Sequence, residues 1–253
     1  MRIAVVTGAS SGMGREFVRQ IGYFYRDLDE IWVISRRKER LERLRKESRT
    51  PLRIFDGDLQ KKHIYKHYHS ELKEWHPEVR MLVNAAGFGK SGSFVQIAAA
   101  GKKLQTDMIN LNCTALTRMI QLTLPFMKKG GRIINLASAA AFCPQNGFAV
   151  YAATKAYVLS LSRALSSELR SKGIIVTAVC PGPVDTEFFK VSGELTSPLK
   201  KLTVVKASAV VRKALKDSRK RREVSVFGVP MKAVRIGARI LPHRLILRTE
   251  ELL

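Results

Sequence analysis

Tyr151 and Lys155 stand four residues apart in the stretch YAATK, so a helix would carry both side chains on one face. A phenol normally loses its proton near pH 10 and is a poor acid or base at pH 7. A lysine ammonium within a few ångströms favours the phenolate, and we expect it to lower the tyrosine pKa by about two to three units, roughly 3–4 kcal/mol. The pair therefore predicts proton transfer at Tyr151. A surface Tyr–Lys pair without a chemical role is the alternative.

Ser138 precedes the tyrosine, at the end of the apolar run GRIINLAS. A serine hydroxyl in that place could hydrogen-bond an oxygen on which negative charge develops. The alternative is an ordinary serine at a strand end. Together with the Tyr–Lys pair, Ser138 predicts a site that moves a proton to or from an oxygen.

A glycine-rich stretch, TGASSGMG, follows the first apolar run of the chain. Its glycines are spaced G-x-x-x-G-x-G, not G-x-G-x-x-G as in the standard dinucleotide-binding fingerprint. We expect Gly8 to permit a tight turn, Gly12 to let the backbone approach a pyrophosphate, and Gly14 to let the next helix pack closely. The free N–H groups at the helix start and the hydroxyls of Ser10 and Ser11 would then face the phosphates. A plain glycine loop is the alternative.

Strand-like and helix-like patterns alternate along the chain. Apolar, β-branched runs predict strands at 3–7, 31–35, 52–55, 80–87, 131–138, 174–182 and 224–227. Helical spacing predicts helices after the glycines, between the third and fourth strands, and at about 36–48, 102–127, 151–171 and 208–221. This alternation predicts an α/β fold, a doubly wound parallel sheet of Rossmann-like type with helices on both faces and right-handed crossovers.

The chemical candidates all follow predicted strands. The glycine turn, NAAG at 84–87, Ser138 and PGPVDT at 181–186 each come at a strand end. In a parallel sheet these ends meet at the carboxyl edge, where doubly wound folds bind their ligands. The chain has no internal repeat, low-complexity tract or Pro/Gly-rich linker, so we expect one domain over residues 1–253.

Charge is the unusual feature of the composition. There are 45 Lys and Arg residues against 21 Asp and Glu, which gives a net charge of +24. Such a charge attracts polyanions but does not identify the kind of polyanion. No recognised nucleic-acid motif accompanies it, so we do not expect nucleic acid as a partner. The three cysteines form no C-x-x-C pair and the histidines have no metal-ligand spacing, so neither a disulfide framework nor a metal site is expected.

Targeting signals are also not expected. No apolar stretch approaches the roughly 18–20 residues of a membrane span, and the opening residues predict a buried strand rather than a signal peptide. With the cysteine usage, this favours a reducing, cytoplasmic location.

The motifs, in this order and spacing, resemble those of the short-chain dehydrogenase/reductase family, in its compact form without a separate substrate domain. The resemblance is strong over about residues 1–190 and loose beyond. It implies an oxidoreductase that interconverts a carbonyl and an alcohol. Tyr151 would donate the proton when a carbonyl is reduced and accept it in reverse, Lys155 would also hold the cofactor ribose, and Ser138 would bind the substrate oxygen.

A fourth catalytic residue in the family is an asparagine in the long helix before the serine strand, linked to the lysine through water. Asn112 fits that place best, with Asn110 as the rival, and an exposed polar position is the alternative. Asparagine is unfavourable inside a helix, which hints at a specific bond. The family's N-N-A-G is here NAAG, so Ala85 replaces a second asparagine and the local bracing must differ.

The resemblance also implies a set of cofactor-binding positions. They are Gly8, Ser10, Ser11, Gly12, Met13, Gly14, Arg36, Arg37, Asp58, Leu59, Asn84, Ala85, Gly87, Tyr151, Lys155, Pro181, Gly182, Val184 and Thr186. Asp58 would contact the adenine amino group, with Asp56 or a solvent-facing role as alternatives. Pro181 and Gly182 would shape the loop over the nicotinamide, whose carboxamide Thr186 would bond.

The second strand ends in VISRRKER, which bears on the choice of nicotinamide cofactor. An NAD-preferring enzyme usually places Asp or Glu there to bind the ribose 2′-hydroxyl. Here the position is Ser35, followed by Arg36 and Arg37, and a guanidinium favours a 2′-phosphate through charge-assisted bonds. We therefore expect NADP(H), held mainly by Arg36, with reduction of the carbonyl as the usual direction.

The last part of the chain suggests a lid and a basic segment. The family resemblance implies a mobile lid over a small-molecule substrate at about 187–205. Side chains that could line an apolar pocket there are Phe188, Phe189, Val191 and Leu195, with Phe142, Phe148 and Met231 as additions. Such a pocket would favour a lipophilic ketone or aldehyde, although ordinary packing is an equal alternative.

Residues 206–253 form the basic C-terminal segment. Lys232, Arg235 and Arg239 share a helix face beside Met231, Val234, Ala238 and Leu241. Such a helix could rest on an anionic membrane surface, or carry a solvated charged face. By analogy with the family we also expect a homodimer or homotetramer. A non-catalytic nucleotide-binding scaffold or a polyanion-binding protein on the same fold is the rival function.

Overall fold

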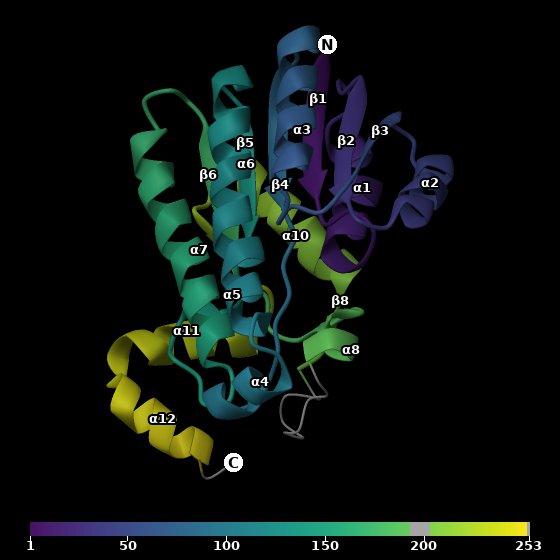
Figure 1. Cartoon of the computed structure of the whole chain (residues 1–253). Helices are drawn as coiled ribbons and strands as arrows, with labels where there is room; N and C mark the ends of the chain where they lie inside the picture. Colours follow the sequence, from purple (N-terminus) through teal and green to yellow (C-terminus); the bar gives the residue numbers. More distant parts are fainter. Residues whose placement is uncertain (193–202, 252–253) are drawn as a thin grey trace.

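The computed structural model describes residues 1–192 and 203–251. Its centre is a seven-stranded parallel sheet with the order β3-β2-β1-β4-β5-β6-β9 (Figure 1). The strands are β1 Arg2–Thr7, β2 Glu30–Ser35, β3 Leu52–Asp56, β4 Glu78–Asn84, β5 Arg132–Leu136, β6 Ile175–Val179 and β9 Val224–Ser225. Two short strands, β7 Val184–Asp185 and β8 Val205–Lys206, pair beside this sheet.

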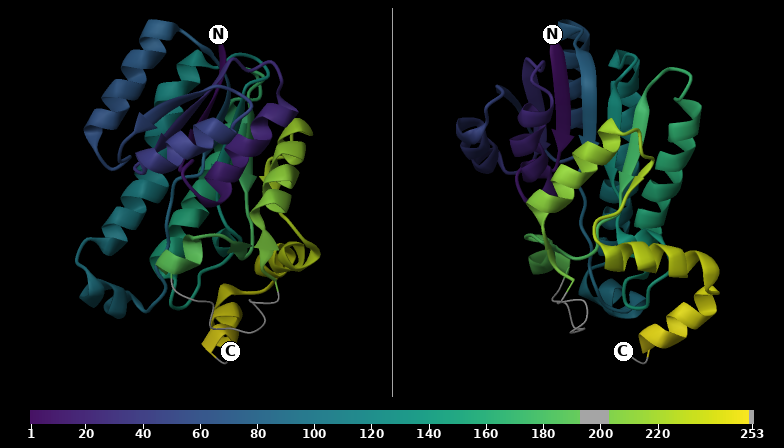
Figure 2. Two further views of the ribbon diagram at one scale, coloured as in Figure 1. Left: turned by 90° about the vertical axis from the view of Figure 1, so that its right-hand side faces the viewer. Right: turned by 180° about the vertical axis from the view of Figure 1, so that it is seen from behind.

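Helices cover both faces of the sheet, as the alternation predicts. The helices are α1 Gly12–Phe24, α2 Lys38–Glu47, α3 Lys62–Trp75, α4 Phe94–Ala100, α5 Leu104–Ile109, α6 Leu116–Thr123, α7 Ala149–Glu168, α8 Phe188–Ser192, α10 Ala207–Arg219, α11 Val229–Ile240 and α12 His243–Glu251. Helices α3, α6 and α7 cover one face of the sheet, and α1, α2 and α10 cover the other (Figure 2). Their buried side chains form two cores, one on each face. Alternate β1 residues serve the two cores, since Ile3 and Val5 face the first and Ala4 and Val6 the second.

The strand order explains where a ligand can bind. From β1 the chain crosses to β2 and β3 on one side, and β4 then begins the other half of the sheet. The connections after β1 and β4 therefore diverge, which leaves a crevice at the carboxyl ends of these two strands. The glycine turn follows β1 and the NAAG stretch ends β4, so both lie at this crevice.

One predicted helix is interrupted in the structure. The segment predicted at 102–127 contains α5, a π-helical turn at Asn110–Ala115, α6 and a 3₁₀ turn at Leu124–Phe126. Pro125 in the last turn lacks an N–H group and cannot continue an α-helix. Hydropathy periodicity does not distinguish a π turn from regular helix, so this break was not predicted.

Among the described residues, three short helices, α4, α8 and α12, were also missed, and β9 covers only part of the predicted 224–227 strand. Helix α4 begins with a capping box, in which the Ser93 hydroxyl accepts from the Gln96 N–H and the Gln96 side chain accepts from the Ser93 N–H. That S-x-x-Q pattern is a readable start signal in the sequence. Helix α12 lies at the end of the chain, where no start signal was recognised.

A buried polar chain joins β4, β5 and α7. Asn84 donates to Asn135 Oδ1 at 2.9 Å, and Asn135 donates to Ser162 Oγ at 3.0 Å. The Thr7 hydroxyl accepts from the N–H groups of Ala85 and Ala86 at 3.1 and 3.2 Å. These contacts brace the crevice without the second asparagine that Ala85 replaces.

Replacing Asn135 should reveal the strength of this brace. We expect Asn135→Ala to lower the free energy of unfolding by about 1–3 kcal/mol, because the buried Asn84 amide loses its acceptor. Urea unfolding of Asn135→Ala, Asn84→Ala and the double variant measures it. The double variant should cost less than the sum of the single variants, and strict additivity would contradict the proposed coupling.

Candidate active site

The glycine turn has the backbone that its spacing predicts. Gly8 has φ +67° and Gly12 φ +51°, a region that side chains disfavour. A Cβ atom on Gly8 would lie 2.8 Å from the backbone of Ala86, and one on Gly14 would lie 2.3 Å from the Gly8 carbonyl oxygen. These close approaches leave room for glycine alone, and the turn forms a cradle at the start of α1.

Arg37 lies against the glycine turn. Its guanidinium donates to Ser10 Oγ at 3.1 Å and to Ser11 Oγ at 2.6 Å, and Ser35 Oγ donates to Ser10 Oγ at 2.7 Å. Arg36, the residue preferred from sequence, is exposed and makes no hydrogen bond or ion pair within the described residues. The choice between the two arginines therefore stays a prediction.

Glu187 is a neighbour that the sequence did not predict. Its carboxylate pairs with Arg40 at 2.6 Å and with Arg37 at 2.9 Å. Hydrogen bonds from these two arginines hold the pKa of Glu187 below its ordinary value. The Glu187 carboxylate thus pairs with the two arginines beside the turn that would otherwise attract a phosphate group. No local signal in the sequence links residues 150 positions apart.

The predicted Tyr–Lys pair lies on one face of α7 and is buried. Tyr151 is 7% exposed and Lys155 is 6% exposed. The lysine Nζ donates to the Leu136 carbonyl oxygen at 2.8 Å and lies 5.6 Å from the centre of the Tyr151 ring. It also lies 3.5 Å from the position that a Cβ on Gly87 would take, so the β4 loop closes over it.

The expected lowering of the tyrosine pKa is wrong for this structure. Burial raises the pKa of Tyr151 to about 12, and a hydrogen bond with the Ser138 side chain lowers it only in part. Burial also lowers the pKa of Lys155 to about 8. Both shifts follow from where the two groups lie. The Leu136 carbonyl holds the lysine Nζ beside the phenol ring, and both groups are shielded from water.

Ser138 completes the cluster from the end of β5. Its hydroxyl accepts from the Ala140 N–H at 3.2 Å, which caps the short 3₁₀ turn Ala139–Ala141. The same side chain hydrogen-bonds Tyr151. The structure therefore brings Ser138, Tyr151 and Lys155 together, as the sequence predicted.

Asn112 is part of the same region and Asn110 is not. Asn112 is buried in the π turn, where its Oδ1 accepts from the Phe88 N–H and its Nδ2 donates to the Phe88 carbonyl and to Thr154 Oγ1, all at 2.9–3.0 Å. Asn110 is exposed. Asn112 therefore joins the loop after β4 to α7, and its catalytic role stays a prediction.

The remaining predicted cofactor residues lie around this crevice. The Asp58 carboxylate accepts from the Gln60 N–H at 2.9 Å and is half-buried, whereas Asp56 is exposed. Leu59 is buried in the core, and its carbonyl accepts from the Tyr65 hydroxyl. Met13 packs beside the second core at the start of α1.

The PGPVDT loop lies between the catalytic cluster and the glycine turn. The Ala139 N–H donates to the Pro181 carbonyl at 2.8 Å, and a Cβ on Gly12 would contact the Thr186 side chain at 3.4 Å. A Cβ on Gly182 would lie 2.5 Å from the Met231 sulfur, so α11 closes against this loop. Val184 is buried in the second core.

Aromatic rings cover Tyr151. The ring centres of Phe148 and Phe188 lie 4.3 and 5.6 Å from that of Tyr151, and this pair is called the aromatic cover below. Gly89, which the sequence did not single out, lies under all three rings, since a Cβ there would come within 3.1 Å of each. A substrate that reaches Tyr151 must therefore displace part of this cover.

The other predicted pocket residues are divided. Phe189 packs edge-on against Phe188 at 6.1 Å, whereas Phe142 and Met231 pack against the first core. Leu195, most of the predicted lid, and the Val191 side chain lie outside the described residues.

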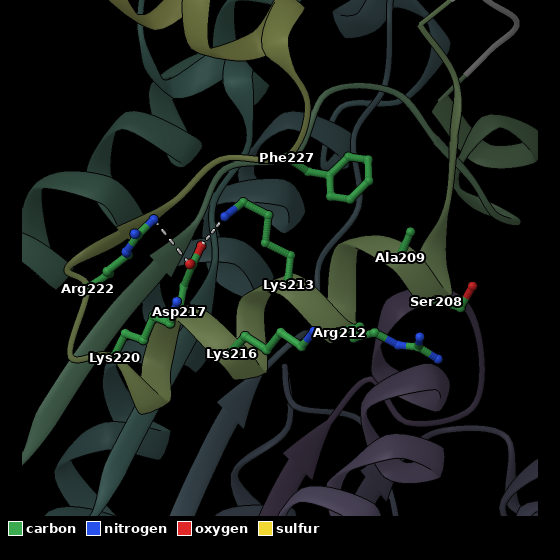
Figure 3. Close-up of a pocket in the computed structure, with 9 residues that line it drawn as sticks. All are labelled: Ser208, Ala209, Arg212, Lys213, Lys216, Asp217, Lys220, Arg222 and Phe227. Carbon is green, nitrogen blue, oxygen red and sulfur yellow. Dashed lines mark hydrogen bonds and ion pairs between the residues drawn. The ribbon is translucent and has the colours of Figure 1, made fainter.

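A separate pocket of about 550 Å³ lies along α10 (Figure 3). Its exposed cations, Arg212, Lys216 and Lys220, follow one another at four-residue intervals, and the buried Asp217 pairs instead with Lys213 and Arg222. None of its lining residues belongs to the glycine turn or the catalytic cluster. Part of the large positive charge is thus concentrated away from the candidate active site.

Metal binding and membrane crossing have no support in the described part of the chain. Residues 1–192 and 203–251 contain no group of three His, Cys, Asp or Glu side chains that could hold a metal ion. None of the helices within these ranges is long and apolar enough to cross a membrane.

Comparisons with known proteins agree with this geometry. The sequence model of the family described as short chain dehydrogenase matches residues 2–195. Mouse 17-beta-hydroxysteroid dehydrogenase type 3 is 32% identical over 193 residues, which cover 74% of this chain and 61% of that protein.

Solved structures match over more of the chain. The short-chain dehydrogenase from Sphingobium yanoikuyae in complex with NADPH is 32% identical, with a TM-score of 0.78 and 94% of each chain covered. The bulky-bulky ketone specific alcohol dehydrogenase from Comamonas testosteroni is 28% identical, with a TM-score of 0.74 and 94% and 92% of the two chains covered.

Two glycine variants separate backbone strain from steric conflict. Gly147 has φ +65° with nothing near a Cβ, so Gly147→Ala should lower the free energy of unfolding by about 1–2 kcal/mol. Gly8 has a similar φ but meets the Ala86 backbone, so Gly8→Ala should cost about 1–3 kcal/mol more. Denaturant unfolding measures both, and equal losses would contradict the close approach.

The raised pKa of Tyr151 can be measured by absorbance titration of the free protein. At pH 10, where an ordinary phenol is half ionised, wild type and Tyr151→Phe should show the same phenolate signal, because Tyr151 stays protonated up to about pH 12. One additional ionised tyrosine in the wild type below pH 10 would show that Lys155 governs the phenol after all.

Proposed function

The chain belongs to the short chain dehydrogenase family of oxidoreductases, and on that premise we propose that it is an NADP(H)-dependent enzyme that interconverts a carbonyl and an alcohol in a lipophilic substrate. The observation that carries this proposal is the cluster of half-buried Ser138 with buried Tyr151 and Lys155, beside a glycine cradle at the carboxyl edge of the sheet.

Tyr151 is the proton-transferring residue in this proposal. When a carbonyl is reduced, its hydroxyl gives a proton to the carbonyl oxygen, and in the reverse direction the phenolate takes that proton back. The phenol is protonated at neutral pH, which is the form that reduction needs, although the raised pKa makes it a weaker acid than an ordinary phenol. Ser138 donates a hydrogen bond to the same oxygen as negative charge develops there.

The residues present fit a dinucleotide. Gly8 and Gly14 let the turn and the start of α1 pack closely at the carboxyl edge of the sheet, where the free N–H groups of the helix start could receive the pyrophosphate. The buried Lys155 ammonium offers donors to a ribose. Asp58 and Thr186 are the proposed contacts of the adenine amino group and the carboxamide. When bound, the nicotinamide supplies or accepts the hydride at the substrate carbon.

Three features support NADP(H) over NAD(H). The last residue of β2 is Ser35, so no carboxylate at that position repels a 2′-phosphate. Arg36 is exposed, and Arg37 lies at the turn. A 32% identical neighbour was solved in complex with NADPH.

The nature of the substrate is inferred from the surroundings of Tyr151. The aromatic cover and Phe189 present apolar surface at the point of chemistry. Relatives named for a hydroxysteroid and for bulky ketones support a lipophilic carbonyl compound. We propose in addition a homodimer or homotetramer and a cytoplasmic location, as the family and the cysteine usage suggest.

The rival proposal is polyanion binding without catalysis. The cationic pocket along α10 is the observation that favours it. A salt-sensitive complex with a labelled DNA duplex, together with no turnover of any carbonyl, would support this rival and reject the enzyme.

Activity can be tested with NADPH and a panel of ketones and aldehydes, by following the loss of NADPH absorbance. We expect turnover of at least one lipophilic member, and a fall of about a hundredfold or more in Tyr151→Phe because the proton donor is lost. Tyr157→Phe is the matched control, since Tyr157 is exposed on the same helix and its hydroxyl bonds to Thr117. Undiminished activity in Tyr151→Phe would refute the assignment.

Glu187 should affect the choice of cofactor. Because its carboxylate occupies Arg37 and Arg40, we expect Glu187→Gln to tighten NADPH binding by about two- to fivefold and to leave NADH binding unchanged. Fluorescence titration with both nucleotides measures this. Glu47→Gln, which breaks a comparable exposed pair with Arg19, is the control. Equal tightening of NADH would argue against a 2′-phosphate at these arginines.

A further inference from the structure

Helix α11 carries an outward apolar stripe. Val229, Ala233, Ile236 and Ile240 recur at intervals of four, three and four residues, which puts them on one face of the helix. All four are exposed, and the exposed fraction is 77% for Val229, 59% for Ile236 and 74% for Ile240. These four residues are called the α11 stripe below.

The opposite face of α11 is the one that packs against the protein. Met231 and Ala238 are partly buried, and Met231 contacts the Gly182 loop. Two of the apolar residues that lie beside the basic face in the sequence, Met231 and Ala238, therefore pack against the domain. The α11 stripe points away from the domain, and packing within residues 1–192 and 203–251 does not account for its composition.

Cations border the stripe and extend along α12. Lys232 and Arg239 are exposed on the edge of the stripe, and Arg244 and Arg248 are exposed on α12. Residues 228–248 contain five Lys or Arg and no Asp or Glu. Exposed Leu241 and Leu245 continue the apolar surface from α11 into α12.

The location of this surface relates it to the active site. Helices α4, α11 and α12 lie at the end of the molecule toward which the β-strands point (Figures 1 and 2). Helix α4 adds two exposed apolar side chains, Phe94 and Val95. The candidate active site opens at this same end, because it lies at the carboxyl edge of the sheet.

We propose that the α11 stripe and the neighbouring cations dock the protein on an anionic phospholipid bilayer. Apolar side chains enter the boundary between headgroups and acyl chains while flanking Lys and Arg attract the anionic headgroups, as in other interfacial helices. Nucleic acid would use the cations but not the apolar side chains. A second copy of the chain on the same stripe would add the same cations to the contact and no acidic partner for them, since residues 228–248 contain no Asp or Glu.

This docking would serve the proposed function. Its benefit to the enzyme rests on that function, but the docking itself does not. A lipophilic carbonyl compound partitions into bilayers. A protein lying on the bilayer with this end inward would receive such a substrate at the edge of the sheet where Tyr151 lies.

The experiment is flotation of the full chain with phosphatidylcholine vesicles prepared with and without phosphatidylserine. We expect the wild type to bind the phosphatidylserine vesicles about tenfold more than the neutral ones. Ile236→Ser/Ile240→Ser should lose about tenfold of this binding, and because both residues are exposed the fold should persist. No binding by the wild type, or full binding by this variant, would overturn the proposal.

A matched pair of charge variants tests the location. Lys232→Glu/Arg239→Glu and Lys216→Glu/Lys220→Glu change the net charge equally, but the second pair lines the pocket along α10 (Figure 3). The first variant should lose most of the binding and the second much less. Equal losses would indicate attraction by net charge alone and would reject the α11 surface.

Three further measurements distinguish lipid docking from self-association and from catalysis. If light scattering without lipid shows a wild-type dimer that Ile236→Ser/Ile240→Ser converts to monomer, the stripe is an interface between copies and the proposal fails. Vesicle binding should be unchanged in Tyr151→Phe, and turnover of a water-soluble ketone should be unchanged in the stripe variant. The docking surface and the enzyme activity can therefore fail independently.

Discussion

The burial of Lys155 is the constraint around which the site is organised. An ammonium group shielded from water needs hydrogen-bond partners, and here the Leu136 carbonyl at the end of β5 accepts from it. That bond fixes α7 against the sheet and sets the position of Tyr151 one turn earlier. Gly87 must lack a side chain because the lysine and Asn112 occupy the adjoining space. The loop after β4, the π turn and α7 are thus fitted to one buried charge.

Much of this arrangement could be read from the sequence. The alternation of apolar strands and amphipathic helices predicted the doubly wound sheet, and strand ends located the glycine turn and Ser138 at one edge. Spacing of four residues was enough to pair Tyr151 with Lys155. These features depend on local periodicity and on the geometry of parallel sheets, which sequence patterns report directly.

Other features depend on contacts that no local pattern contains. The direction of the Tyr151 pKa shift is set by burial, which outweighs the hydrogen bond with Ser138, and the Phe148 and Phe188 rings are among the groups that bury the phenol. Glu187 reaches Arg37 only because the chain returns to the glycine turn after β6. The identity of the outward face of α11 required knowing that Met231 packs on Gly182. Tertiary structure decided all three.

The short strand β9 has a consequence for the behaviour of the protein in concentrated solution. It forms one margin of the sheet but pairs with β6 through only two residues, and basic residues Arg221 and Arg222 precede it. So short an edge strand offers few free backbone groups for pairing with a strand of another molecule. The sheet therefore ends there without inviting strand-by-strand growth into fibrils.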